Sequence, residues 1–127
     1  MKNQAYRMTM LFDFYGELLT DRQKEFFDLY YNEDLSLAEI AENYGISRQG
    51  VRDAIVRAEG IMSEMEDKTG IIRRFFQTRD RLASVAGELD AILARNEVKY
   101  EDPQLEASAR RAKEAIEQLM QEEPHGI

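Results

Sequence analysis

Apolar side chains recur every three or four residues along most of the chain, which is the spacing that places them on one face of an α-helix. The pattern is clearest over residues 35–62, where two short amphipathic segments flank Gly45. Ser36 is followed three places later by Glu39, the spacing of a capping box, and glycine suits the left-handed backbone that ends many helices. Ser47 can then cap a second helix. This order predicts a helix-turn-helix.

The second of these helices has an apolar side and a polar side. Its expected inward positions are Val51, Ala54, Ile55, Ala58 and Met62. In a DNA-reading module of this kind, the second helix enters the major groove with its N-terminal residues at the base edges. The predicted nucleic-acid-binding residues are therefore the outward-facing Arg48, Gln49, Arg52 and Arg57. The alternative is an ordinary solvated helix face.

Two further residues bear on this prediction. Gly50 lowers helix stability by about 1 kcal/mol relative to alanine, which would be explained if the backbone must approach a ligand closely there. Asp53 repels phosphate unless it accepts a hydrogen bond from a cytosine amino group, and it could instead pair with Arg57 four residues on.

The remaining sequence predicts helices on both sides of this motif. A first helix over residues 5–15, with Tyr6 and Met10 on its apolar side, is expected to end at Gly16. A second has a Thr20–Gln23 capping box and runs to about Asn32. Aromatic residues cluster in this N-terminal region and are expected to fill the core.

The C-terminal part predicts two longer helices. After a bend at Thr69 and Gly70, one helix covers residues 71–95, and another runs from Pro103 to about Gln121. The apolar seam of the first helix is Ile72, Phe75, Arg79, Leu82, Ala86, Leu89 and Leu93, and that of the second is Leu105, Ala109, Ala112, Ile116 and Leu119. These seams expose more apolar surface than a lone hairpin can hide, so we expect a homodimer.

The fold prediction is therefore all-α, with two parts. Residues 1–70 form a helix-turn-helix domain within an N-terminal helix bundle. Residues 71–127 form a C-terminal helical hairpin, a dimerisation element packed on that domain, with a frayed tail from about residue 122.

Two stretches of the sequence carry a resemblance to known proteins. LSLAEIAENYGISRQGVRDAIVRAE resembles the DNA-reading end of bacterial sigma factors. Taken together with YRMTMLFDFYGELLTDRQKEFFDLYYNEDLS, the chain is similar to the YlxM family of small helix-turn-helix proteins, which are associated with the bacterial signal recognition particle. The resemblance covers residues 6–95. It implies a regulatory role near the particle's GTPase and no established reaction.

Charge weakens the case for a simple DNA-binding protein. The chain has 17 basic and 25 acidic residues and a net charge of −8, whereas duplex DNA favours a basic partner. Residues 1–70, which contain the helix-turn-helix, carry 8 basic and 14 acidic side chains. Acidic clusters could instead steer association with a basic protein, and the candidates are Asp21, Glu25 and Asp28, and Glu64, Glu66 and Asp67.

Composition argues against several other classes of function. The chain has no cysteine, and its single histidine, His125, lies near the C-terminus. We therefore expect no catalytic residues, no metal site and no cofactor. No apolar stretch is long enough for a signal peptide or a membrane span, so a cytoplasmic protein without membrane contact is expected.

Two functional hypotheses follow. The first is a non-enzymatic regulator of the signal recognition particle pathway, which contacts the GTPase, the particle RNA or both, and retains a helix-turn-helix able to bind double-stranded DNA. The second is a sequence-specific transcriptional regulator with no direct contact to the particle. Four outward side chains do not define a target sequence.

Overall fold

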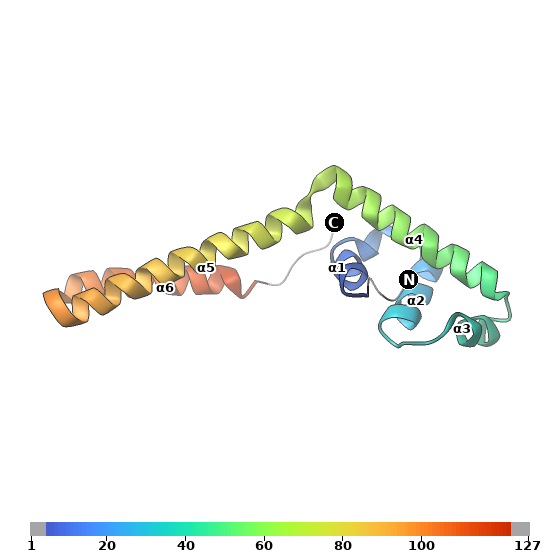
Figure 1. Cartoon of the computed structure of the whole chain (residues 1–127), viewed down its shortest axis with the longest axis horizontal. Coiled ribbons are helices and arrows are strands. Elements are labelled where there is room, and N and C mark those ends of the chain that lie inside the picture. The colour runs from blue at the N-terminus through green and yellow to red at the C-terminus, as the bar shows by residue number, and fades with distance from the viewer. Residues whose placement is uncertain (1–4, 123–127) are drawn as a thin grey trace. The chain divides into compact units, whose positions relative to one another are not determined.

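A computed structural model of the protein describes residues 5–122, and the regular secondary structure in this part of the chain is helical, without a strand (Figure 1). The α-helices are α1 (Ala5–Tyr15), α2 (Asp21–Tyr31), α3 (Leu37–Tyr44), α4 (Arg48–Thr69), α5 (Ile71–Arg95) and α6 (Pro103–Met120). A short 3₁₀ turn, Gly16–Leu18, follows α1, and a π-helical turn, Asn96–Tyr100, follows α5. The all-α prediction is confirmed.

The described residues fall into two compact units, one that extends to Ile72 and one that begins at Arg73. The sequence placed the division after residue 70. Packing of the second unit on the first stays a prediction. The predicted frayed tail and His125 belong to residues 123–127, which lie outside the described part of the chain. No helix within residues 5–122 is long and apolar enough to cross a membrane.

The first unit is built around α4, against which α1, α2 and α3 pack (Figure 1). Its largest fully buried side chains are Leu11, Phe14, Tyr15, Phe26, Phe27, Ile40, Val51, Ile55 and Met62. The expected aromatic core is therefore present. Tyr6, however, was assigned to the apolar side of α1 and is 75% exposed, because the buried face of this helix passes through Met8 and Leu11 instead.

The ends of the helices follow the predicted capping signals. Thr20 and Ser36 each form a complete capping box, with Gln23 and Glu39 respectively. Gly45 ends α3 in the left-handed conformation, with φ of 66°, and Gly70 ends α4 in the same way, with φ of 62°. Both are positions where a side chain would strain the backbone.

The end of α4 and the first residues of α5 share a hydrogen-bonded group that the sequence did not reveal. The Tyr15 hydroxyl donates to Glu66 Oε1 at 2.6 Å and also lies 2.6 Å from Thr69 Oγ1. The same Glu66 oxygen accepts the backbone N–H of Ile72 at 3.0 Å. Glu66 was predicted to belong to a solvated acidic cluster. That prediction is wrong, because its carboxylate turns inward to satisfy the first N–H groups of α5.

The second unit is a hairpin in which α5 and α6 lie side by side and antiparallel (Figure 1). At its closed end, the side chain of the buried Asn96 accepts from the Asp102 backbone N–H and donates to the Asp102 carbonyl oxygen, both at 2.9 Å. Asp102 in turn caps α6, and Pro103 occupies the first helical position. Lys113 Nζ bridges back to Asp90 at 2.6 Å.

Burial along the hairpin matches the predicted seam on one helix better than on the other. Every member of the α5 seam is half-buried. On α6, Ala109 is buried and Ile116 half-buried, but Ala112 and Leu119 are exposed. The half-buried positions that flank Ile116 are Lys113 and Met120. The face of α6 that meets α5 is therefore rotated relative to the predicted stripe.

Candidate nucleic-acid interface

The candidate interface is the N-terminal part of α4. Ser47 begins this helix by accepting the Gly50 backbone N–H at 3.0 Å, which fixes the orientation of the first turn. Val51 and Ile55 are fully buried and anchor the helix in the core. The four predicted nucleic-acid-binding residues, Arg48, Gln49, Arg52 and Arg57, are all exposed on its other side.

These four side chains do not form one cluster. Arg48 and Arg52 are one helical turn apart and share a flank of α4. Arg57 follows Arg52 by five residues, which places it about 140° further around the helix. On that opposite flank, Arg57 lines a shallow groove together with the start of α2.

The groove contains a basic residue that sequence reasoning missed. Arg22 of α2 lines it with Arg57, and its guanidinium lies over the rings of Phe26 at 5.4 Å and Tyr44 at 5.8 Å. These cation–π contacts orient the side chain beside α4. Nothing local in the sequence distinguishes Arg22 from a solvated residue, since only the packing of α2 on α4 brings it near the motif.

Asp53 has a different partner from the one predicted. Gln49 Nε2 donates to Asp53 Oδ1 at 2.8 Å, so the acidic residue pairs one turn back with Gln49 and not forward with Arg57. Asp53 lies between the two basic flanks, where its charge opposes a phosphate. A base contact by Gln49 would have to compete with this hydrogen bond or be oriented by it.

The capping geometry gives a reason for Gly50 within its own helix. A Cβ atom at this position would lie 3.2 Å from Ser47 Oγ and 3.7 Å from Ile46 Cδ1. The first of these contacts is tight, and it involves the oxygen that caps the helix. Glycine therefore leaves room for the cap of α4.

Hydrogen bonds between helices hold the interface in place. The Tyr31 hydroxyl of α2 donates to Glu59 Oε2 of α4. Burial, together with the neighbouring Glu59 carboxylate, raises the pKa of Tyr31. A hydrogen bond to Glu25, followed by desolvation, raises the pKa of Tyr44. The Tyr31 hydroxyl thus ties α2 to α4, and the Tyr44 hydroxyl ties α3 to α2.

Comparison with known proteins identifies the family. Residues 2–101 match a family model described as "UPF0122: Putative helix-turn-helix protein, YlxM / p13 like". The chain belongs to the UPF0122 family. It is 39% identical to a UPF0122 protein of Acetivibrio thermocellus over 119 residues, which cover 94% of this chain and 98% of that protein. A relative from Desulforamulus reducens is 45% identical over 87 residues, 68% of this chain and 74% of the relative.

The UPF0122 match encloses the whole candidate interface but ends before α6. A relative from Bacillus cereus, 46% identical over 89 residues, likewise covers 70% of this chain and 80% of that protein. The alignment to the Acetivibrio thermocellus protein is long enough to include most of α6. No solved structure matches the chain. The resemblance to YlxM inferred from the sequence is thus confirmed at the level of the family.

Proposed function

We propose that the protein is a non-enzymatic regulator of the signal recognition particle pathway, in which the helix-turn-helix unit binds nucleic acid through the first turns of α4. The observation that supports nucleic-acid binding is the exposure of Arg48, Gln49 and Arg52 on a capped helix whose other side is buried. In this proposal Arg57 and Arg22 contact the phosphate backbone of the nucleic acid, from the flank of α4 opposite to Arg48 and Arg52. The pathway is proposed from the YlxM resemblance, with the particle GTPase and its RNA as partners.

The alternative is a sequence-specific DNA-binding regulator without direct contact to the particle. The same α4 geometry favours it, since helices with this position in the motif read the major groove. The net charge of −8 opposes both forms of nucleic-acid binding by reducing long-range attraction to phosphate. Binding should therefore be weak at physiological salt and rise steeply as the salt concentration falls.

A comparison of two charge-removing variants tests the nucleic-acid contact. Arg52→Ala should weaken binding to duplex DNA or to the particle RNA, by about 1–3 kcal/mol if Arg52 reads a base. Lys68→Ala removes the same charge from the far end of α4, where Lys68 pairs with Glu64, and should have little effect. Titrations at two salt concentrations separate a base contact from a phosphate contact. Equal losses in the two variants would reject a localised interface.

A mixing experiment separates the two functions. Purified protein is combined with the particle GTPase, with and without the particle RNA, and both complex formation and GTP turnover are measured. A complex with the GTPase alone supports contact with a protein partner, whereas a complex only in the presence of RNA supports contact through α4. The absence of any complex would reject the pathway assignment and favour the DNA-binding alternative.

A further inference from the structure

Each helix of the hairpin carries a seven-residue repeat with two parallel apolar rows. The first row of α5 contains Phe75, Leu82 and Leu89, and the first row of α6 contains Ala109 and Ile116. The second rows lie beside these. They consist of Thr78, Val85 and Ile92 on α5, and Leu105, Ala112 and Leu119 on α6.

The hairpin covers its first rows and leaves its second rows exposed. Ala109 is buried, and Leu82, Leu89 and Ile116 are half-buried between the two helices. In contrast, Val85 is 47% exposed and Leu119 is 51% exposed. The contact between α5 and α6 does not reach the second rows, which need another layer to be buried.

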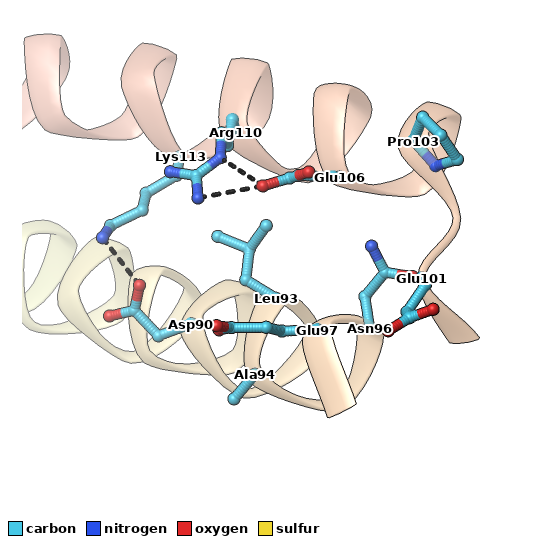
Figure 2. A pocket seen from close by; sticks show the side chains of 10 residues that line it. All are labelled: Asp90, Leu93, Ala94, Asn96, Glu97, Glu101, Pro103, Glu106, Arg110 and Lys113. Atoms are coloured by element: carbon cyan, nitrogen blue, oxygen red, sulfur yellow. Dashed lines mark hydrogen bonds and ion pairs between the residues drawn. The ribbon is translucent and has the colours of Figure 1, made fainter. Parts of the chain in front are cut away.

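The two second rows lie on the same side of the hairpin. The opposite side is marked by charged residues: Asp90 of α5 is bound to Lys113 of α6, and Glu106 is bound to Arg110 within α6 (Figure 2). Ile92 is two residues from Asp90, and Ala112 is two residues from Arg110, so each lies about 160° around its helix from that charged side. We call the side formed by the second rows the apolar face.

We propose that the apolar face is the interface of a homodimer, in which two hairpins pack together as a four-helix bundle. Such bundles bury both rows of a seven-residue repeat on every helix. None of the six residues of the apolar face is charged, whereas the opposite side is rich in charge. Depletion of charge at the centre of a surface patch is characteristic of protein interfaces.

The distribution of side-chain size favours a second copy of the chain as the occupant. The α5 half of the face carries the bulky Val85 and Ile92. On the α6 half, the small side chain of Ala112 leaves a depression in the middle of the row. The Asp90–Lys113 ion pair sets Ile92 level with Ala112 along the hairpin. A two-fold axis parallel to the helices then places α5 of one copy over α6 of the other, with the large Ile92 of each copy above the small Ala112 of its partner.

The area of the face is close to the lower limit for a stable dimer. With 18 residues, α6 gives the face a length of about 27 Å, and two adjacent helices give it a width of about 20 Å. Two such faces have a flat area of about 1,100 Å². The uneven surface of the side chains makes the accessible area larger, near the roughly 1,200 Å² at which stable interfaces begin. The seam predicted for α5 is used within the hairpin, whereas Leu105, Ala112 and Leu119 of the seam predicted for α6 belong to the face proposed for dimerisation.

Two alanines on α6 provide a matched test. Ala112 lies on the apolar face and Ala107 lies elsewhere on the same helix, and both are exposed. Sedimentation equilibrium should show a dimer for the wild type and for Ala107→Glu. Ala112→Glu should raise the dimer Kd by about 100-fold or more, because symmetry places two unpaired carboxylates in the interface. Circular dichroism checks that the variants keep their helix content.

The proposal would be overturned if the wild type stayed monomeric at concentrations up to about 100 µM. Such a dissociation constant would be far weaker than that of a specific interface of this size. Equal dissociation constants for the two alanine variants would also overturn the proposal. The arrangement of the helices can be tested separately, because the chain has no cysteine. A mixture of Ile92→Cys and Ala112→Cys chains should form mainly the mixed disulfide on oxidation. Predominant Ile92→Cys homodimers would show that α5 lies over α5, and would reject the proposed two-fold axis.

Discussion

At the scale of single residues, the hydrogen bond between Tyr31 and Glu59 makes the stability of the fold sensitive to pH in the alkaline range. The pKa of Tyr31 is raised in the folded protein, so the fold prefers the neutral phenol. The contribution to stability is present below the unfolded pKa of about 10, and it is lost as pH rises from there towards the higher folded value. We expect the free energy of unfolding to fall above pH 10.

Tyr31→Phe should lower the free energy of unfolding by about 1 kcal/mol at pH 7, because the variant loses the hydrogen bond to Glu59. Above pH 10 the free energy of unfolding should fall less steeply with pH in the variant than in the wild type. The two slopes should differ by part of the roughly 1.4 kcal/mol per pH unit that corresponds to one proton. Urea denaturation at pH 8, 10 and 11 measures both effects. Glu59→Gln keeps an acceptor but removes the charge, and it should also flatten the alkaline slope. Parallel slopes in all three proteins would contradict this assignment.

Residues whose roles depend on near neighbours in the sequence were predicted well. Ser36, Ser47 and Gly45 act within one helical turn, so their spacing determines what they do. Glu66 and Arg22 depend on partners in other helices, with Glu66 bonded to Tyr15 across 51 positions. No local pattern encodes such a contact. At Gly50 the structure adds a reason that the sequence did not indicate, because a side chain there would crowd the oxygen of Ser47 that caps the helix.

At the scale of elements, the boundary between α5 and α6 depends on Asn96. Its side chain makes both hydrogen bonds to the backbone of Asp102 while 4% exposed. Asn96→Ala should destabilise the hairpin by about 1–3 kcal/mol, because buried polar groups of the turn lose their partners. Hydrogen exchange of the α6 amides measures this locally.

The matched control for this prediction is Gln104→Ala, which alters an exposed side chain in the first turn of α6. Its effect should stay within about 0.5 kcal/mol, as for most surface substitutions. Faster exchange of similar size in both variants would mean that the first turn of α6 is sensitive to any truncation. In that case Asn96 would have no special role in closing the hairpin.

The same turn explains why the helices could be predicted and their contact could not. The spacing of apolar residues identifies the apolar stripe of α6. The stripe is wide, however, so α5 could pack against either of its two edges. Which flank meets α5 depends on the path of the chain through Asn96–Tyr100 and on the pairing of Lys113 with Asp90. Ala112 and Leu119 therefore remained exposed where burial was expected.

At the scale of the whole molecule, the acidic balance bears on the choice of partner. Of the two acidic clusters proposed to steer association, the one with Glu64 and Asp67 loses Glu66 to the hydrogen-bonded group at the end of α4. The cluster on α2 keeps Asp21 and Glu25 exposed, although Glu25 also accepts a hydrogen bond from Tyr44 of α3. If the particle GTPase is a partner with basic surface, the α2 cluster is the better candidate for electrostatic steering.

Reversing Asp21 and Glu25 to lysine should slow association with the GTPase more than it speeds dissociation, because charges at the rim of an interface act mainly on encounter. The effect should shrink as salt is raised, since the Debye length falls from about 10 Å at 0.1 M to about 3 Å at 1 M. The control reverses Glu114 and Glu117, two exposed residues of α6, and changes the net charge by the same amount. Stopped-flow kinetics at several salt concentrations gives both rates. Slower association in both double variants would reflect net charge alone, and unchanged rates would leave the α2 cluster with a role in solubility only. Slower association confined to the α2 variant would locate the encounter surface on the helix-turn-helix unit.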